Sequence, residues 1–401
     1  MKKIPVGHLT VGMFIQEICG SWMDHPFWKT SFLLTSDQDY QTLVQSGVHE
    51  VWIDPDKGLD VSQDTPSLDA EQVRQQAESL LTATQQLAPP DLRVPFREEI
   101  ERARFIHARA KTAVTSMFQE VRMGQALTAD AAYPLVAEIH QSVARNSDAL
   151  LNLARLKNKN DYTYLHSVAV CALMLALGKQ LGISGDELMH AGAAGLLHDV
   201  GKMMIPDEVL NKPGRLTDAE FNTIKSHPSL GHEILLKSGG LHPIVLDVCL
   251  HHHEKIDGSG YPEGLSGQDV SLYARMGTVC DVYDAITSER CYKTGWEPTM
   301  AIRKMAEWQS SHFDLRIFHA FVRTVGIYPT GALVKLKSER LGLVVEQHPA
   351  SLLTPYVRVF FSLRKNCHLE PKILDLSTGE DTVIAAETPE RWNFPASVLA
   401  L

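Results

Sequence analysis

The segment Ala191-Gly-Ala-Ala-Gly-Leu-Leu-His198-Asp199-Val-Gly201-Lys202 decides how the middle of this chain folds. Its first five residues are all Ala or Gly, and such small side chains let neighbouring helices approach closely. We therefore expect a helix inside a bundle, with His198 and Asp199 deep in its interior. A buried imidazole beside a buried carboxylate costs free energy unless the two are paired or bind a metal ion. Gly201 is expected to end this helix, which places the ammonium of Lys202 near the same site.

Histidine is concentrated around this segment. The 88 residues from His166 to His253 hold nine of the chain's 18 histidines, whereas an even spread would give about four. Further candidate ligands in helical contexts are the residues His166, His227, His252, His253 and Asp281. Imidazole and carboxylate without thiolate suit Fe, Mn, Zn or Ni. A carboxylate that bridges two ions about 3.5–4 Å apart is the usual arrangement for phosphate-ester hydrolysis.

Apolar residues recur at helical spacing around these candidate ligands, and Gly and Pro separate the helical segments. Helices are predicted at 100–121, 132–156, 161–181, 186–198, 217–237, 241–252, 272–288, 298–310 and 315–325. Thr217 and Glu220 form a capping-box pattern at the start of one of them. The sequence thus predicts an all-α bundle in the middle of the chain.

Both ends of the chain are β-rich by contrast. Strand-like runs are predicted at 11–15, 32–34, 48–53, 332–336, 341–346, 356–361 and 373–376. A polar stretch before the bundle is predicted to be a linker with a helical piece at 70–87. We therefore predict an α+β multidomain protein, with a β-rich module over 1–60, a linker over 61–96, a helical domain over 97–330 and a β-rich appendage over 331–401.

Composition narrows the class of protein. Of the 401 residues 44% are apolar and 21% are charged, which is ordinary for a globular protein. The net charge of −10 argues against a partner such as duplex nucleic acid, although it leaves a small anionic substrate open. The six cysteines form no CxxC pair, which favours a reducing compartment. No secretory signal is apparent, and the longest uncharged run, 162–178, is short for a bilayer. We expect a cytoplasmic protein without membrane insertion.

Several long motifs stand in one order along the chain. They are His166-Ser167, His198-Asp199-Val-Gly-Lys202, His227-Pro228, His252-His253-Glu254-Lys-Ile-Asp257-Gly-Ser-Gly260-Tyr261-Pro262 and Asp281-Val-Tyr-Asp284-Ala-Ile-Thr-Ser-Glu-Arg290. Over about 125–330 the chain resembles the HD-GYP family of cyclic di-GMP phosphodiesterases. Its N-terminal segment resembles a module of unknown function that often precedes HD-GYP domains in bacteria, which implies a bacterial cytoplasm.

The resemblance implies a site and a reaction. His166, His198, Asp199 and Asp281 would hold one metal, and Asp199 would bridge to a second one held by His227, His252 and His253. A hydroxide between the two metals would attack phosphorus, hydrolysing cyclic di-GMP to pGpG or GMP. The metals would be Fe or Mn, with Ni, Zn or Mg as alternatives. The expected substrate contacts are Lys202, Gly260, Tyr261, Arg290 and Lys293.

The sequence departs from the fullest family pattern at two positions. Some members bind a third metal through a Glu four residues before the first ligand histidine, and this chain has Tyr162 there. The usual Arg-Pro-Tyr reads Arg290-Cys291-Tyr292. Two metals are therefore expected. A weakly active cyclic di-GMP sensor or docking module stays open as an alternative, as does a nucleotidase of the wider HD superfamily. The 100–121 helix is expected to belong to the core, with a homodimer interface as the alternative. A signalling-protein partner is also left open.

Other polar residues near the motifs are not expected to be metal ligands. Three successive histidines point about 100° apart on a helix, so they cannot all face one site. The register of Glu254 favours His252 and His253 as ligands, and His251 is expected at the surface or behind a ligand. Asp284 is expected to orient a ligand imidazole or a nearby cation. Core, capping or surface roles are expected for His190, His232, Cys249 and Cys280.

Overall fold

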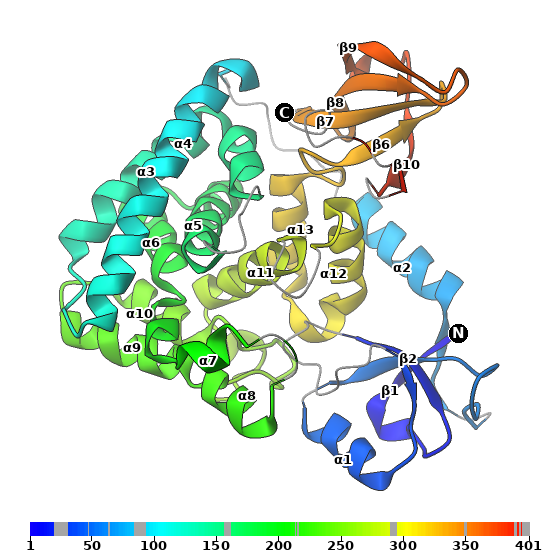
Figure 1. The fold of residues 1–401 in the computed structure, drawn as a ribbon, viewed down its shortest axis with the longest axis horizontal. Helices are drawn as coiled ribbons and strands as arrows, with labels where there is room; N and C mark the ends of the chain where they lie inside the picture. Colours follow the sequence, from blue (N-terminus) through cyan, green and yellow to red (C-terminus); the bar gives the residue numbers. More distant parts are fainter. Residues whose placement is uncertain are drawn as a thin grey trace.

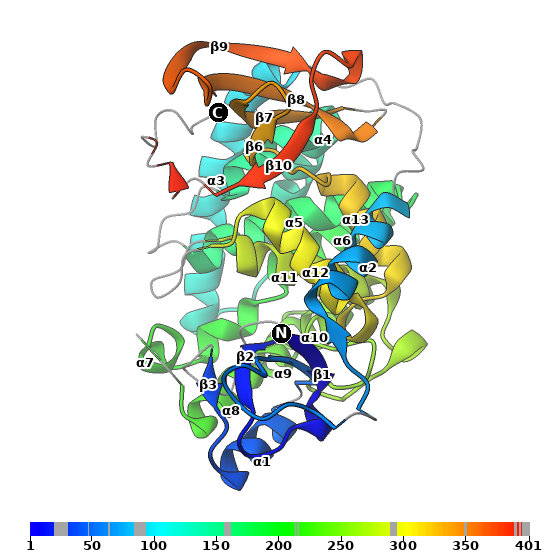
Figure 2. The same cartoon turned by 90° about the vertical axis from the view of Figure 1, so that its right-hand side faces the viewer.

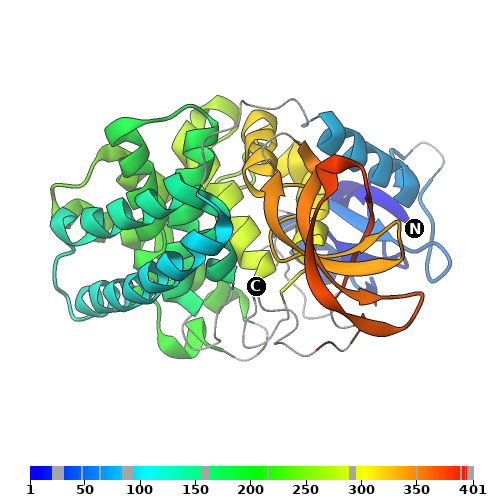
Figure 3. The same cartoon turned by 90° about the horizontal axis from the view of Figure 1, so that it is seen from above.

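The computed structural model describes residues 1–19, 31–46, 48–62, 65–83, 94–155, 162–212, 214, 216–288, 295–348, 351–388, 391–392 and 394. Two small antiparallel sheets flank a helical body at opposite ends of one side, as Figures 1 and 2 show. Seen from above, the cyan and green helices lie on one side of the yellow helices and the sheets on the other (Figure 3). The predicted α+β multidomain architecture, with β-rich ends around a helical centre, is confirmed.

The N-terminal sheet has the strand order β3-β2-β4-β1-β5. Its strands are β1 (Lys2–Pro5), β2 (Phe14–Ile18), β3 (Phe32–Leu33), β4 (Glu50–Ile53) and β5 (Leu68–Asp69), with helix α1 (Asp37–Gln45) between β3 and β4. Ile4, Ile15 and Ile53 are fully buried on its inner side, where Leu34 and Leu43 close a small separate core. Helix α2 (Ala70–Ala83) then leads from this sheet along α12 (Pro298–His312), as Figure 2 shows.

The helical body carries most of the hydrophobic core. It comprises α3 (Phe96–Arg122), α4 (Ala129–Arg155), α5 (Tyr162–Gln180), α6 (Gly185–Leu197), α7 (Asp207–Leu210), α8 (Asp218–Lys225), α9 (His227–Ser238), α10 (Pro243–His251), α11 (Leu272–Thr287), α12 and α13 (Leu315–Val325). Helix α5 is apolar all round, as befits a helix covered by neighbours, and its residues Leu165–Leu177 are buried. Among the described residues, no helix is both long enough and apolar enough to cross a membrane.

The small residues of α6 bring this helix against α5. A Cβ added to Gly195 would lie 2.9 Å from the carbonyl oxygen of Val170 and 3.0 Å from the Cα of Cys171. A Cβ added to Gly192 would lie 2.8 Å from the side chain of Leu175. Any larger residue at these two positions would push the helices apart. The close approach predicted from the Ala/Gly run is therefore confirmed, and it carries His198 into the interior.

The C-terminal sheet has the order β10-β6-β7-β8-β9 and is antiparallel throughout. Its strands are β6 (Leu333–Leu336), β7 (Arg340–His348), β8 (Ser351–Ser362), β9 (Cys367–Asp375) and β10 (Val383–Glu387). Strands β1 and β10 were not expected from the sequence, and neither was the two-residue strand β5 of the N-terminal sheet. Each is short, and Pro5 in β1 and Ala385-Ala386 in β10 give little β signal.

One predicted helix proves to be two. The segment predicted as a single helix over 217–237 divides at Ser226 into α8 and α9. Pro228 causes the break, because it has no N–H to donate to the carbonyl four residues earlier. The predicted capping box at Thr217 and Glu220 is present at the start of α8. The domain boundaries predicted near 60, 96 and 330 stay a prediction.

Candidate metal centre

Five separate elements bring the seven predicted ligands together. His166 lies on α5, His198 and Asp199 follow α6, His227 opens α9, His252 and His253 follow α10, and Asp281 lies on α11. Each of the seven side chains is buried. Two groups of side chains have ligand atoms within 4.8 Å of one another, namely His227, His252 and His253 in one group and His166, His198 and Asp199 in the other.

Asp199 lies between the two groups and turns one carboxylate oxygen toward each. Its Oδ2 is 3.4 Å from Nε2 of His166 and 3.4 Å from Nε2 of His198. Its Oδ1 is 3.3 Å from Nε2 of His227 and 3.8 Å from Nε2 of His252. A carboxylate with this orientation has the geometry of a bridging ligand between two cations.

Asp281 closes the cluster from α11. Its Oδ1 is 2.9 Å from Nε2 of His166, and its Oδ2 is 3.9 Å from Nδ1 of His253. The pKa of Asp281 lies well below its ordinary value; burial opposes this shift, but hydrogen bonding by His166 and His198 outweighs it. Asp281 and Asp199 together therefore supply two buried negative charges.

Hydrogen bonds fix the outer nitrogens of three histidines. Nδ1 of His198 donates to the carbonyl of Gly195 at 2.8 Å, and Nδ1 of His227 donates to that of Ile224 at 2.7 Å. Nδ1 of His252 lies 3.0 Å from two backbone carbonyls of α10. Because a carbonyl oxygen only accepts, Nδ1 carries the proton in each neutral ring and the Nε2 lone pair faces inward.

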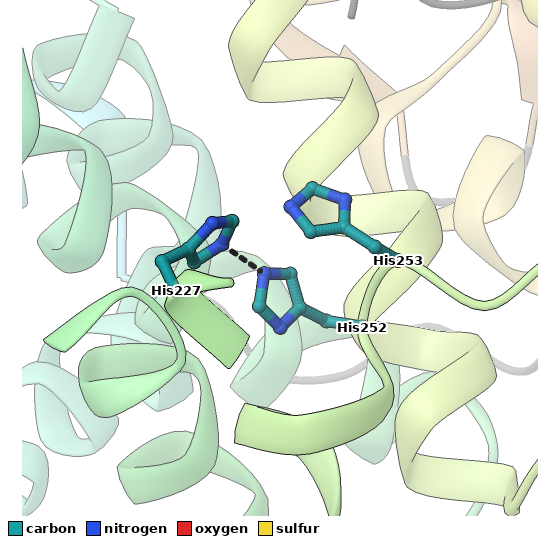
Figure 4. A group of neighbouring side chains, drawn as sticks. All are labelled: His227, His252 and His253. Carbon is teal, nitrogen blue, oxygen red and sulfur yellow. Dashed lines mark hydrogen bonds between the residues drawn. The ribbon is translucent and has the colours of Figure 1, made fainter. Parts of the chain in front are cut away.

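The inward nitrogens of His227 and His252 converge on one point. Figure 4 shows the two rings turned toward each other, with His253 beside them. The Nε2 atoms of His227 and His252 are 3.3 Å apart. With both protons on Nδ1, neither Nε2 has a hydrogen to donate to the other. Two lone pairs that face each other at this distance repel unless a cation lies between them, as it does for two ligands of one metal ion.

The pKa values of the cluster reflect both the burial of its side chains and the charges that face them. Burial lowers the pKa of His227, and it lowers that of His253 to about 3, so these imidazoles are neutral. Burial opposes the charged form of His198 as well, but Asp199 reverses this effect and raises the pKa of His198 to about 10. A proton on Nε2 of His198 thus takes the place that a cation would occupy when bound. The attraction of nearby cations holds the pKa of Asp199 well below its ordinary value in spite of its burial.

Four buried polar atoms of the cluster lack a hydrogen-bond partner among the described residues. They are Nε2 of His198, Oδ1 of Asp199, Nε2 of His253 and Oδ2 of Asp281. Buried polar atoms in native proteins are otherwise nearly always paired. Unpaired nitrogens and oxygens that surround one point fit divalent cations, and the residues present therefore fit divalent metal binding.

Lys202 places a cation at the edge of the cluster. It extends from the 3-10 turn Val200–Met204, and its Nζ is 2.5 Å from Oδ2 of Asp199. A Cβ added to Gly201 would lie 1.9 Å from the carbonyl oxygen of His227, so only glycine lets this turn lie against α9. The prediction that Gly201 ends the helix is wrong, because α6 ends at Leu197 and Gly201 lies in the 3-10 turn that packs the two halves of the cluster together.

The structure describes three of the five predicted substrate contacts. Besides Lys202 these are Gly260 and Tyr261, whose loop lies beside His253. The Tyr261 ring stacks on the His253 ring with 4.8 Å between their centroids. Arg290 and Lys293 lie outside the described residues, as does Cys291, and the side chain of Tyr162 is not described either.

The residues expected outside the ligand set do lie elsewhere. His251 pairs with Asp247 at 2.8 Å and faces away from the cluster. His190 accepts from or donates to the hydroxyl of Tyr133 at 2.7 Å and stacks on His242. Burial raises the pKa of the Cys249 and Cys280 thiols, so both are neutral core residues. Asp284 accepts a hydrogen bond from Nδ1 of His166, as predicted.

Two features of the site were missed from the sequence. The carboxylate of Glu254 accepts three backbone hydrogen bonds from the loop that carries Tyr261, which composition does not reveal. The second is the carbonyl of Ile224, which Pro228 leaves without its helical donor and which His227 then uses. The adjacent letters His227-Pro228 are a signal for that arrangement, since a proline frees the carbonyl four residues before it.

Comparisons with known proteins show which families this chain resembles. A family model described as HD domain matches residues 140–317, and one described as a domain of unknown function, DUF3391, matches residues 1–132. The cyclic di-GMP phosphodiesterase PA4108 of Pseudomonas aeruginosa is 53% identical over 397 residues, which cover 98% of this chain and 94% of that protein. The cyclic di-GMP phosphodiesterase response regulator RpfG of Xanthomonas campestris pv. campestris is 38% identical over 195 residues, 47% of this chain and 50% of that one. Among solved structures, Bd1817, a HDG"Y"P protein from Bdellovibrio bacteriovorus, aligns with a TM-score of 0.46 and 16% identity over 80% of this chain and 98% of that chain.

Proposed function

The chain belongs to the HD-domain family of cyclic di-GMP phosphodiesterases, and from this premise we propose which of its residues carry the hydrolysis. The activity is hydrolysis of the phosphodiester bonds of cyclic di-GMP, and the family expected from the motifs is the correct one. The observation that carries the residue assignment is Asp199, whose two oxygens face two separate groups of buried histidines.

The seven clustered side chains would divide between two cations. His166, His198 and Asp281 would hold the first, His227, His252 and His253 would hold the second, and Asp199, which faces both groups, would be shared. Iron or manganese is the proposed metal, because mixed imidazole and carboxylate ligands suit such ions, with Ni, Zn or Mg as alternatives. Two bound cations would activate a water for in-line attack on phosphorus and offset the charge on the phosphate oxygens.

Lys202 contributes the protein's own positive charge next to the cations. Its Nζ already lies against Asp199 at 2.5 Å, and its side chain keeps 14% of its exposure, so a phosphate oxygen can reach it. We assign it to the phosphate group, where a fixed ammonium stabilises the negative charge that develops on phosphorus-bound oxygens. Arg290 and Lys293 are proposed as further contacts to the dinucleotide, and the loop of Gly260 and Tyr261 as the neighbour of a guanine.

A matched pair of variants on one helix tests the assignment. Protein purified under reducing conditions and loaded with Fe or Mn is expected to convert cyclic di-GMP to pGpG or GMP. His227→Ala should lose nearly all turnover, whereas His232→Ala, on the same helix α9 but outside the cluster, should keep it. Asp199→Asn should be as inactive as His227→Ala, because no bridge remains. Full turnover by Asp199→Asn would contradict the mechanism.

Metal analysis of the same preparations tests the stoichiometry. Two ions per chain are expected in the wild type, and three would contradict the inference drawn from Tyr162. Tight binding of cyclic di-GMP with no product over hours, in protein that holds two metals, would favour a sensor or docking role instead. A preference for mononucleotides in a substrate screen would favour a nucleotidase.

A further inference from the structure

His253 is held differently from the other candidate ligand histidines. Each of the other four has an Nδ1–H that donates to a carbonyl or a carboxylate, and this bond fixes its ring. Within the described residues, no hydrogen bond fixes the ring of His253, whose Nδ1 is 3.9 Å from the nearest oxygen of Asp281 and whose Nε2 is buried without a partner. Ring contacts therefore orient this imidazole, and within the cluster the rings of His252 and His227 lie at centroid distances of 4.1 and 5.0 Å from it.

The side chain that contacts the ring of His253 from the loop is Tyr261. The two rings are nearly parallel, at 25°, with 4.8 Å between their centroids. The backbone N–H of Tyr261 donates to the carbonyl of His253 at 3.3 Å, so backbone and ring both attach to the same residue. The ammonium of Lys225, at the end of α8, lies 5.2 Å from the Tyr261 ring centroid and adds a cation–π contact.

The loop that carries Tyr261 is anchored by the residue that follows His253. Glu254 is 1% exposed. Its Oε1 accepts from the backbone N–H of Glu263 at 2.7 Å and of Gly264 at 3.1 Å, and its Oε2 accepts from that of Leu265 at 3.1 Å. A single carboxylate thus satisfies three consecutive backbone donors, and hydrogen bonds to an ionised acceptor are stronger than neutral ones.

Two further contacts are made to the backbone of Glu254, one from the loop and one from α11. A Cβ added to Gly260 would lie 2.4 Å from the Cα of Glu254, so the loop directly touches the backbone beside His253. The hydroxyl of Thr278, on the helix that carries Asp281, donates to the carbonyl of Glu254 at 3.3 Å. Glu254 therefore ties together the loop, the ligand pair and α11.

We infer that Glu254 is a positioning residue for the ligand His253: its carboxylate folds residues 255–265 so that the ring of Tyr261 lies against the imidazole of His253. The role of Glu254 is indirect, because none of its atoms faces the proposed metal site. Tyr261 then has two roles: it orients the metal ligand His253, and it lies next to the substrate. The inference rests on the proposed function only in that His253 is a metal ligand; the ring contact itself does not require metal.

The first test is therefore made on chelator-treated full-length protein. With histidine labelled by ¹³C at Cε1, the His253 resonance should be shifted by the ring current of Tyr261, and the His253→Gln variant assigns it. Glu254→Ala and Tyr261→Leu should both abolish this shift. Tyr261→Phe, which keeps the ring, should retain it, and so should Glu263→Gln, which alters an exposed carboxylate of the same loop. An unchanged His253 resonance in Glu254→Ala would overturn the inference.

The second test measures metal affinity by competition with a chelator, using Mn²⁺. Glu254→Ala and Tyr261→Leu should weaken one of the two bound ions about 10–100-fold, the usual effect of losing support for a ligand, and leave the other unchanged. Should Glu254→Ala fail to fold, the comparison of Tyr261→Leu with Tyr261→Phe decides the matter. Wild-type affinity for both ions in Tyr261→Leu would overturn the inference, whereas failure of the wild type to bind two ions would contradict only the proposed function.

Discussion

The imidazole of His166 donates its Nδ1–H to Oδ2 of Asp284 at 2.6 Å, and both side chains are buried. This bond leaves Nε2 of His166 as the atom that faces Asp199 and Asp281. A carboxylate behind a ligand imidazole fixes the ring and makes the inward nitrogen more basic. Asp284 thus fixes the ring of His166, as backbone carbonyls fix the rings of His198, His227 and His252.

Asp284→Asn should lower the affinity of the protein for one of its two divalent ions about 10–100-fold. The amide oxygen still accepts a hydrogen bond from His166, but it lacks the negative charge that raises the basicity of the ring. The affinity is measured by chelator competition with Mn²⁺, and turnover of cyclic di-GMP should fall with it at limiting metal.

Asp247→Asn is the matched control for that variant. Asp247 pairs with His251 through the same kind of contact, at 2.8 Å, but outside the cluster. Its affinity for both ions should equal that of the wild type. An equal loss of metal in both variants would mean that the effect comes from general destabilisation and not from the ligand His166.

Gly201→Ala tests how closely the two halves of the cluster pack. The added Cβ would lie 1.9 Å from the carbonyl oxygen of His227 and 2.5 Å from the backbone nitrogen of Gly231. Backbone atoms cannot rotate away, so we expect the free energy of unfolding in urea to fall by about 3 kcal/mol, the upper end of the usual cost of overpacking.

Gly7→Ala provides the comparison for this substitution, because no heavy atom lies within 4 Å of the added Cβ. Its free energy of unfolding should stay within about 0.5 kcal/mol of the wild type. Equal stability of the two variants would show that the turn after Asp199 can move away from α9 at little cost.

The sequence alone identifies most of this site because its chemistry is concentrated in short motifs. The Ala/Gly run before His198 predicts a close helix contact, and the structure contains it at Gly192 and Gly195. The 100° step between successive helical residues shows that His251, His252 and His253 cannot all face one site, and the register of Glu254 then selects the last two. Family order then supplies Asp281, which no local pattern distinguishes from other acidic residues.

What the sequence could not predict depends on contacts between distant segments. The three backbone donors that bind Glu254 come from residues 263–265, and only the folded loop brings them to it. The division of the 217–237 helix depends on one proline within a pattern that is otherwise continuous. Strands β1 and β10 are defined by their partners β4 and β6 and by little in their own composition.

The pH dependence of stability should reflect Glu99, which joins α3 to α4. Its carboxylate accepts from Arg145 at 2.6 and 2.8 Å and from Ser142 at 2.8 Å. Burial alone would raise the pKa of Glu99, but these donors hold it below its ordinary value of 4.5. A lowered carboxyl pKa stabilises the fold above the unfolded-state pKa, and the stabilisation is lost as the pH falls through the folded-state pKa.

Glu99→Gln should therefore lower the free energy of unfolding by about 1–3 kcal/mol at pH 7, and the difference from the wild type should shrink below about pH 4.5. Urea denaturation of both proteins at several pH values measures this. Glu101→Gln is the control, since Glu101 is 70% exposed and pairs with Arg104 at the surface. A difference for Glu99→Gln that stays constant as the pH falls well below the ordinary carboxyl pKa would contradict the assignment of the charge.

Two neighbouring lysines should differ in how much they hold the N-terminal sheet to the helical body. Lys3 is 5% exposed in its side chain, and its Nζ lies 2.6 Å from Glu50 and donates to the carbonyl of Glu307, on α12, at 3.2 Å. Lys3→Met leaves that carbonyl and a partly buried carboxylate without their donor, so the free energy of unfolding should fall by about 2 kcal/mol.

Lys2 provides the control. It pairs with Asp60 at 2.7 Å, but the two side chains are 36% and 45% exposed, so Lys2→Met should change the free energy of unfolding by less than about 1 kcal/mol. Urea denaturation measures both, and equal effects of the two substitutions would show that the contact between Lys3 and α12 does not stabilise the attachment of the sheet.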